Sequence, residues 1–184
     1  MAQRIDDGLV SVEEYLEIDD RSEVRHEYVG GTLYAMTGGT HRHNRIAFNI
    51  ARKLDDASSD GPCDVYIADM RFQIGNVYYY PDVMVACEPP ETENPRWRTN
   101  PCLVVEVLSP TSVSTDQREK LIAYRSVPTI ETYLIVHQDT QRVERHFRNE
   151  KGEWARADHV RDGYIPIPCP ETRLTLAEIY RGLS

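Results

Sequence analysis

The sequence predicts a mixed α/β fold with a central β-sheet, and three observations support this prediction. Segments with helical and strand-like patterns follow one another as helix, hairpin, helix, three strands, helix and strand, and a β-rich tail completes the chain. Residues 103–108 (LVVEVL) are almost continuously apolar, as expected of a strand that is covered on both faces. Ile46, Ile50 and Leu54 recur every four residues, which is the spacing of an amphipathic helix.

The first predicted elements are a short helix and a hairpin. Ser11 is a suitable N-cap for a helix over residues 11–17, and Glu14 completes a capping box with it. The pair Gly30-Gly31 separates the strand-like runs VRHEYV and TLYAM. Because two-residue hairpin turns require positive φ values, this Gly-Gly pair predicts an antiparallel hairpin.

The remaining elements follow from apolar periodicity and from the positions of glycine and proline. A helix is expected from about residue 43 to 57, and another from 114 to 125, which Pro128 prevents from continuing. Strands are expected over residues 63–74 (with a bend near Ala68-Asp69), 77–87, 102–109, 131–137 and 142–149, with an edge strand over 152–160 and a small helix over 175–183.

Composition limits the class of protein. The 184 residues carry a formal net charge of −9 and are 40% hydrophobic, values that suit one globular domain spanning residues 1–184. No apolar run approaches the roughly 20 residues of a membrane helix, and the N-terminus lacks the apolar core of a signal peptide. We therefore expect a cytoplasmic protein that does not contact a membrane. The acidic balance disfavours passive binding to phosphates but does not exclude DNA, because a bound divalent cation adds local positive charge.

The four cysteines give no clear metal or disulfide signal. None of Cys63, Cys87, Cys102 and Cys169 forms a C-x-x-C pair, so a zinc knuckle is not expected. The thiols of Cys87 and Cys102 lie in apolar runs and are expected to pack as small hydrophobic groups, while disulfides are possible but not indicated.

Two carboxylates are the strongest candidates for a functional site. Glu106 lies inside an apolar strand, where a carboxylate is costly unless it is paired, hydrogen-bonded or metal-bound; the alternative is a solvated strand end or a salt bridge. Asp82 follows Pro81 at the start of the apolar run DVMVA, where it could also serve a turn. If the two strands are neighbours, the carboxylates converge, and together with the Val107 carbonyl they suit Mg²⁺ or Mn²⁺.

Lys120 is the candidate third catalytic group, since it lies on the helix that follows the Glu106 strand. A lysine near a metal-bound water could orient that water or stabilise negative charge in the transition state. The alternative is a solvated lysine paired with Asp116, one helical turn earlier. The spacing His41-x-His43 does not predict a zinc site, because residues two apart on a helix point in different directions.

The chain resembles the PD-(D/E)XK nuclease superfamily, and within it the large branch of restriction endonucleases that is abundant in cyanobacteria. The stretches that carry this resemblance are HEYVGGTLYAM, HNRIAFNI, YPDVMVA, VVEVLSPTS and EKLIAYR followed by ETYLIV, from about Val12 to Ile179. The resemblance implies a restriction-endonuclease-like core, with Asp82, Glu106 and Lys120 as catalytic residues.

One position departs from the superfamily pattern. The usual lysine lies two residues after the glutamate, and this chain has Leu108 there. The branch commonly has an apolar residue at that position, which implies that the lysine has moved to the following helix, as Lys120. The resemblance also implies that Glu27 and His43 lie near the site; from the residues alone, Glu27 could be an exposed charge and His43 a helix cap or a packing residue.

The function predicted from these features is Mg²⁺- or Mn²⁺-dependent hydrolysis of phosphodiester bonds in DNA. Two alternatives stay open: a catalytically inactive binding or scaffold module with the same fold, which the net acidity favours, and a metal-dependent hydrolase of small phosphate esters. Since many endonucleases cut both strands as symmetric dimers, a homodimer is expected.

Overall fold

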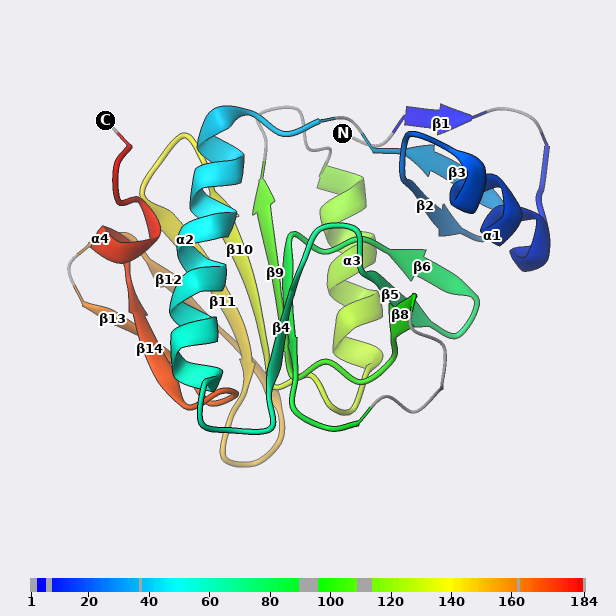
Figure 1. Ribbon diagram of the computed structural model, residues 1–184. Helices are drawn as coiled ribbons and strands as arrows, with labels where there is room; N and C mark the ends of the chain where they lie inside the picture. The colour runs from blue at the N-terminus through cyan, green and yellow to red at the C-terminus, as the bar shows by residue number, and fades with distance from the viewer. Residues whose placement is uncertain are drawn as a thin grey trace.

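The computed structural model confirms the mixed α/β fold with central sheets flanked by helices (Figure 1). The structure describes residues 3–5, 8–36, 38–89, 96–108, 114–161 and 163–183. Its helices are α1 (Val12–Arg21), α2 (His41–Ser58), α3 (Ser114–Ser126) and α4 (Leu176–Ile179).

The central sheet has six strands in the order β12-β11-β10-β9-β7-β4. Strand β9 is parallel to β10 and antiparallel to β7, so the sheet is mixed. As predicted, the strand after residue 152 lies at the edge. The bounds of these strands are β4 (Asp64–Ile67), β7 (Val83–Ala86), β9 (Leu103–Leu108), β10 (Thr132–His137), β11 (Arg142–Arg148) and β12 (Trp154–His159).

The predicted N-terminal hairpin belongs to a second six-stranded sheet, which packs against α1 at one side of the central sheet (Figure 1). Gly30 and Gly31 have φ values of 56° and 86°, as the two-residue turn requires. The strand order is β1-β3-β2-β6-β5-β8, with bounds β1 (Gln3–Ile5), β2 (His26–Val29), β3 (Thr32–Ala35), β5 (Arg71–Ile74), β6 (Val77–Tyr79) and β8 (Trp97–Arg98).

Two segments that the sequence analysis interpreted as single strands each cross from one sheet to the other. The segment 63–74 leaves β4 of the central sheet and enters β5 of the N-terminal sheet, turning at Asp69, whose φ is 55°. The segment 77–87 returns from β6 to β7 through Tyr80-Pro81-Asp82. Proline interrupts strand pairing because it has no amide hydrogen, which explains why the second segment divides at Pro81.

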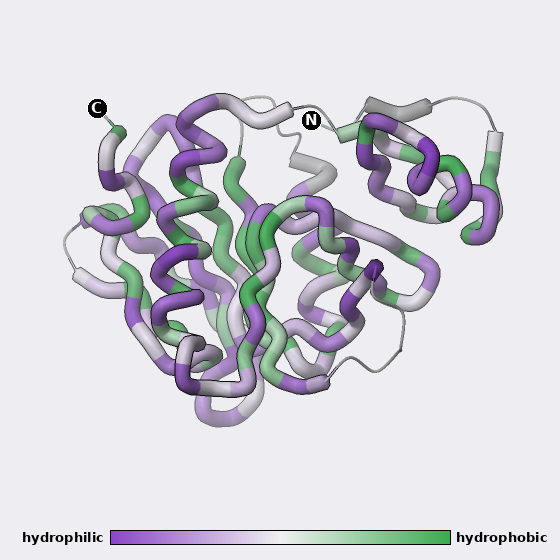
Figure 2. Tube along the Cα trace, in the orientation of Figure 1, coloured by the Kyte–Doolittle hydropathy of each residue, from purple (hydrophilic) through white to green (hydrophobic). Residues whose placement is uncertain are grey.

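Helices α2 and α3 cover opposite faces of the central sheet because alternate residues of its strands point to opposite sides. Helix α2 packs on the face that also meets the hairpin β13 (Tyr164–Ile167) and β14 (Thr172–Thr175) and helix α4. Helix α3 packs on the other face, where Tyr124 contacts Tyr79 and Tyr133. Figure 2 shows the expected pattern: hydrophobic stretches along the strands, and alternating hydrophobic and hydrophilic residues around α2.

The structure corrects the interpretation of the cysteines. Strands β4 and β7 pair with Asp64 opposite Ala86, and one further step of this register brings Cys63 opposite Cys87. Disulfides join Cys63 to Cys87 and Cys102 to Cys169. Cys87 and Cys102 pack with the hydrophobic core as expected, but they are disulfide-bonded rather than free, because strand pairing brings together cysteines that are distant in the sequence.

Two further comparisons concern helix length and membranes. Helix α4 covers only Leu176–Ile179 of the predicted 175–183, and its N-cap is Thr175 in a capping box with Glu178.

In the described ranges no helix is both long and apolar enough to cross a membrane.

Candidate functional site

Asp82 and Glu106 are brought together by the pairing of β7 with β9, which confirms the prediction that these strands are neighbours. Val83 lies opposite Val105 and Met84 opposite Val104, so the next step of the register places Asp82 opposite Glu106. The amide of Val107 donates to Oδ2 of Asp82 at 2.7 Å, which fixes the aspartate against the end of β9.

Glu106 points toward α3, because its neighbours Val105 and Val107 point toward α2. Its Oε1 accepts hydrogen bonds from the Tyr124 hydroxyl at 2.7 Å and from Nζ of Lys120 at 3.3 Å. Burial raises the pKa of Glu106 to about 8; Lys120 opposes this rise, and the charge of Asp82 adds to it. A carboxylate with such a pKa is typical of a functional site.

Lys120 also joins Glu106 to Glu27, which comes from the N-terminal sheet. Nζ of Lys120 lies 2.8 Å from Oε1 of Glu27, and both side chains are about nine-tenths buried or more. The backbone amide of Tyr80 donates to the same Glu27 oxygen at 3.2 Å. Glu27 is therefore a buried ion-pair partner rather than an exposed charge, and Lys120 is not a solvated lysine. The side chain of Asp116 lies outside the part of the chain that the structure describes.

His43 contacts the other side of the site. It lies in the first turn of α2, where the hydroxyl of Thr40 accepts a hydrogen bond from its backbone amide and caps the helix. Its Nε2 lies 2.8 Å from Oδ1 of Asp82, and this hydrogen bond raises the pKa of His43 although burial opposes the rise. His43 is thus neither a cap nor a packing residue, since its ring contacts a carboxylate of the site.

The cluster contains more acidic than basic side chains. Three carboxylates, those of Glu27, Asp82 and Glu106, converge on the single ammonium group of Lys120 and on His43. Both side-chain contacts of Glu106 are made by Oε1, so among the described residues its Oε2 has no hydrogen-bond partner. Carboxylate oxygens are the ligands that Mg²⁺ and Mn²⁺ prefer, so Glu27, Asp82 and Glu106 are the residues here that could hold such an ion.

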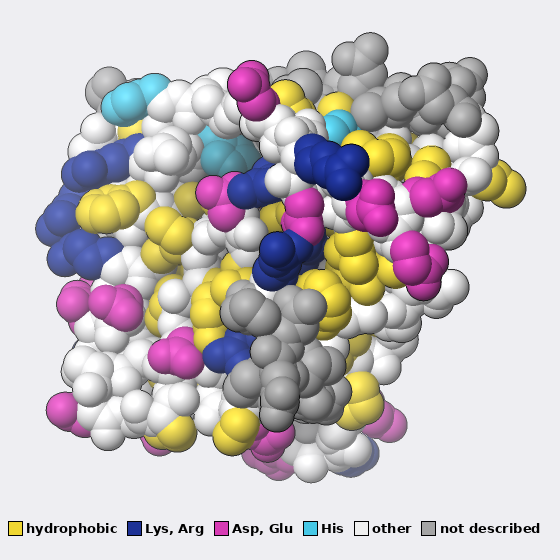
Figure 3. All heavy atoms as spheres, turned by 45° about the vertical axis from the view of Figure 1, so that its right-hand side comes forward, with side chains coloured by type: hydrophobic (Ala, Val, Ile, Leu, Met, Phe, Trp, Pro, Cys, Tyr) yellow, Lys and Arg dark blue, Asp and Glu magenta, His cyan; other side chains and the backbone are white. Residues whose placement is uncertain are grey.

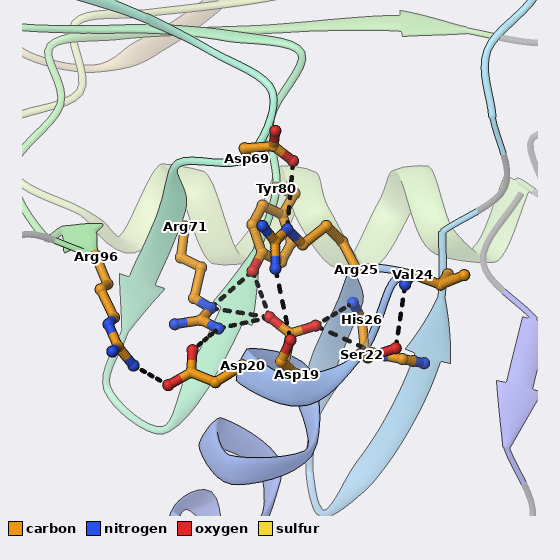
Figure 4. Close-up of polar contacts among 10 residues, drawn as sticks. All are labelled: Asp19, Asp20, Ser22, Val24, Arg25, His26, Asp69, Arg71, Tyr80 and Arg96. Atoms are coloured by element: carbon orange, nitrogen blue, oxygen red, sulfur yellow. Dashed lines mark hydrogen bonds and ion pairs between the residues drawn. The ribbon is translucent and has the colours of Figure 1, made fainter.

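A buried polar network lies next to this site (Figure 4). Asp19, at 0% exposure on α1, accepts hydrogen bonds from Nη2 of Arg71 at 2.6 Å, from the Tyr80 hydroxyl at 2.5 Å and from the His26 amide at 2.7 Å. Burial alone would raise the pKa of Asp19, but the hydrogen bonds from Tyr80 and Arg71 outweigh it and hold the pKa below its ordinary value.

The network holds the backbone beside two site residues. His26 immediately precedes Glu27, and Tyr80 lies two residues before Asp82. Because Asp19 bonds both His26 and Tyr80, it fixes β2 against the segment that leads from β6 into β7. At the periphery of this network Arg71 and Arg96 contact Asp20, and Arg25 contacts Asp69.

Several residues around the site were not identified as site residues from the sequence. Tyr124 is buried and contacts Glu106, and burial keeps the pKa of its hydroxyl well above the ordinary value. Tyr79 donates a hydrogen bond to Glu119, and its ring lies 5.6 Å from Nζ of Lys120. The spacing of Lys120 and Tyr124 on one helix face is a signal that could have identified Tyr124 once Glu106 was placed opposite that face.

Known proteins match this chain over most of its length. Residues 12–177 match the model of the Uma2 family, which is described as "Putative restriction endonuclease". Two uncharacterized proteins of Synechocystis sp. are similar: slr1290, 32% identical over 95% of this chain and 93% of its own length, and sll1609, 33% identical over 79% and 85%.

A solved structure shows the same fold. The crystal structure of a "putative nuclease belonging to DUF820" from Anabaena variabilis aligns with a TM-score of 0.77 over 93% of this chain and 97% of that chain. The sequence identity is 15%, so this likeness concerns the fold.

Proposed function

Because the chain belongs to the Uma2 family of restriction-endonuclease-like proteins, we propose that it is a Mg²⁺- or Mn²⁺-dependent endonuclease that hydrolyses phosphodiester bonds of DNA. The observation that carries this proposal is the buried contact of Lys120 with both Glu27 and Glu106, beside Asp82. These residues come from β2, the start of β7, β9 and α3, and folding alone would not require so many charges at one place.

Each residue of the cluster has a distinct role in this proposal. Asp82 and Glu106, with the carbonyl of Val107, hold the cation. When bound, the cation polarises the phosphodiester and lowers the pKa of a water molecule. The ammonium group of Lys120 orients the attacking water and stabilises negative charge on the phosphate. His43 and Tyr124 fix the carboxylates of Asp82 and Glu106 through the hydrogen bonds described above.

The position of Lys120 supports the assignment of the lysine to α3. Leu108 occupies the position where the superfamily has its usual lysine, and it packs with the hydrophobic residues on the α3 side of the sheet. Glu106 points to this same side, and Nζ of Lys120 reaches it from the helix. The ammonium group therefore approaches Glu106 from the side on which the strand lysine would lie.

Helix α2 offers a surface for the DNA backbone. Its outer side carries Arg45, which is partly exposed, and the exposed Phe48 and Arg52 at spacings of three and four residues, which places them on one face of the helix. Arg52 pairs there with Asp56, one turn later. The guanidinium group of Arg45 lies over the Phe48 ring at 5.6 Å. The same helix begins with His43 beside Asp82, although His43 and Arg45, two residues apart, point in different directions. Basic side chains of this kind contact phosphates.

The function can be tested by cleavage of supercoiled plasmid DNA. We expect nicking or linearisation with Mg²⁺ or Mn²⁺ and none with EDTA. Glu106→Gln should abolish cleavage, because the amide is nearly isosteric but is a poor cation ligand. Glu131→Gln, at an exposed glutamate next to β10, is the matched control and should cut normally. Cleavage by Glu106→Gln at the rate of the unchanged protein would contradict the proposal.

One observation favours the two alternative functions. The net charge is −9, and the face shown in Figure 3 mixes acidic and basic side chains, with a group of basic ones at its left edge. A scaffold module or a hydrolase of small phosphate esters needs no extended basic surface. Cation binding without cleavage of DNA or nucleotides would favour the scaffold, and cleavage of nucleotides alone would favour the small-ester hydrolase. The homodimer also stays a prediction.

A further inference from the structure

All four cysteines of the chain lie in one cluster, although they come from four separate segments. Cys63 precedes β4, Cys87 follows β7 and Cys102 precedes β9, so three of them lie at the same end of three neighbouring strands. Cys169 lies in the turn between β13 and β14. The sulfurs of Cys63, Cys87 and Cys169 all lie within 4.8 Å of one another.

The fourth sulfur, that of Cys102, lies beside two members of this group of three but outside the group itself. Cys102 is bonded to Cys169, and its Sγ lies 3.6 Å from Sγ of Cys87. The sulfurs of Cys87 and Cys169, which belong to different disulfides, are 2.9 Å apart. In a tetrahedral zinc site, Zn–S distances of about 2.3 Å place the sulfurs about 3.8 Å apart. Once the disulfides are reduced, Cys63, Cys87 and Cys169 already lie near these distances, and a movement of the Cys102 side chain toward Cys63 would complete a Cys₄ site.

We propose that, when reduced, Cys63, Cys87, Cys102 and Cys169 form a tetrahedral site for one Zn²⁺ ion. This site is separate from the candidate active site and does not rest on the proposed nuclease function. Its four thiolates are soft ligands, which select zinc over the Mg²⁺ or Mn²⁺ that the carboxylates suit. The burial of the cluster supports this assignment, since Cys102 is 8% exposed and the other three are partly buried.

The disulfide state would convert to the zinc-bound state in two steps. Each of the two disulfides takes two electrons and two protons from one molecule of a dithiol, which is itself oxidised to a cyclic disulfide. The resulting four thiols then release four protons as they bind one Zn²⁺ ion as thiolates. The disulfide state and the zinc state use the same four sulfurs, so each excludes the other.

The site would connect the C-terminal hairpin to the central sheet. Cys169 contributes from the β13–β14 turn, while the other three ligands lie at the ends of β4, β7 and β9. Asp82 and Glu106 lie toward the other ends of β7 and β9, away from the cysteines. Four residues of strand span about 13 Å, so the two sites are well separated along β7.

Zinc content of the protein prepared with a dithiol reductant and Zn²⁺ tests the proposal. We expect one zinc per chain after removal of excess metal, a mass that shows four reduced cysteines once zinc is removed in acid, and release of zinc by an organomercurial that titrates the thiols. Replacing Zn²⁺ with Co²⁺ should give thiolate-to-cobalt charge-transfer bands. These measurements use the unchanged chain, so they do not depend on whether a cysteine variant folds.

Two variants separate this site from the carboxylate site. Cys102→Ser should lower the affinity for zinc at least tenfold and weaken the cobalt charge-transfer bands. Glu106→Gln should keep one zinc per chain and the full cobalt spectrum, because Glu106 lies at the other end of β9. Three outcomes would each overturn the proposal. Both disulfides could persist in the reductant, or the four cysteines could be reduced and bind no zinc. Alternatively, Glu106→Gln could lose zinc while Cys102→Ser keeps it.

Discussion

Nε2 of His43 lies 2.8 Å from Oδ1 of Asp82, although 39 residues separate them in the sequence. The contact joins the first turn of α2 to the segment that enters β7. The second oxygen of Asp82 accepts a hydrogen bond from the Val107 amide. Asp82 is therefore held from two sides in a fixed orientation at the end of β9. This fixed carboxylate is the basis of the first prediction.

Asp82→Asn is expected to abolish most binding of Mn²⁺ or Mg²⁺ at the carboxylate site. The amide removes one negative charge and one anionic ligand, while its shape allows the fold to persist. Isothermal titration calorimetry with Mn²⁺ or Mg²⁺ would measure this loss. Asp139→Asn, at an exposed aspartate after β10, should bind the cation normally. Equal affinity of Asp82→Asn and the unchanged protein would remove Asp82 from the site.

Lys120→Met is expected to slow cleavage by about 10²–10³ while cation binding persists, because the ammonium group is proposed to position water and stabilise charge rather than to bind the cation. Single-turnover cleavage of plasmid DNA would measure the rate, and circular dichroism would check the fold. Lys53→Met is a matched control, since Lys53 on α2 pairs with Glu178 away from the site. An unchanged rate in Lys120→Met would show that the catalytic lysine is not on α3.

Asp19→Asn is expected to destabilise the protein by about 3 kcal/mol, because it leaves the buried guanidinium of Arg71 without its closest anionic partner. Urea denaturation followed by circular dichroism would measure the change. Asp55→Asn, at an exposed position of α2, should have little effect. A loss below about 0.5 kcal/mol would mean that Asp20, the other partner of Arg71, compensates for the substitution.

Stability is expected to fall as the pH falls from about 6.5 toward 4, partly because of His146. Burial, with the nearby charges of Arg125 and Arg156, lowers the pKa of His146 to about 4, although Glu144 and Asp158 oppose this. Its Nδ1 accepts a hydrogen bond from Arg125 at 3.0 Å, and its Nε2 is buried without a partner among the described residues. Below pH 6.5 the unfolded chain therefore binds a proton that the folded chain does not bind.

The contribution of His146 is on the order of 3 kcal/mol between these pH values. Urea denaturation at pH 7 and pH 4.5 would measure it, and His146→Gln should lose a smaller part of its stability over this range than the unchanged protein. His41→Gln, at an exposed position in α2, is the control and should keep the full dependence. The same loss in His146→Gln as in the unchanged protein would show that other groups cause it.

Arg45→Gln combined with Arg52→Gln is expected to weaken DNA binding and to lower the slope of log affinity against log salt concentration by about 1 to 2. Each lost phosphate contact removes about 0.9 from this slope. Fluorescence anisotropy at several salt concentrations would measure this slope, with all proteins carrying Glu106→Gln so that the DNA is not cut. The control is Arg173→Gln on β14, which removes one positive charge at a site away from α2 and should leave the slope unchanged. An unaltered slope in the double variant would place DNA on another face.

The sequence predicted the elements of this fold better than their distribution between sheets. The capping box of Ser11 and Glu14 and the Gly30-Gly31 turn depend on neighbouring residues, so the sequence alone was enough to predict them. The division of 63–74 and 77–87 between two sheets depends on tertiary pairing, which local patterns do not report. Two local signals mark the points of division: the bend expected near Ala68-Asp69, where the chain turns, and Pro81.

The same difference separates the parts of the candidate site. The neighbouring positions of Asp82 and Glu106 could be inferred from two apolar strands that are consecutive in the chain. The contact of Lys120 with Glu27 could not be inferred in this way, because it joins residues 93 positions apart, one on helix α3 and the other on β2 of the N-terminal sheet. The cysteine cluster was missed for the same physical reason, since its members have no short spacing and meet only through strand register and the β13–β14 turn.

The position of Glu27 has a thermodynamic consequence for the two sheets. Glu27 belongs to the N-terminal sheet, whereas Glu106 belongs to the central sheet, and Lys120 bridges them. Any rotation of one sheet against the other would stretch this bridge and change the local field at the carboxylates. A cation held by the carboxylate cluster, as proposed, would therefore be linked reciprocally to the angle between the sheets: a ligand that favours one angle is itself bound more tightly when that angle is already adopted.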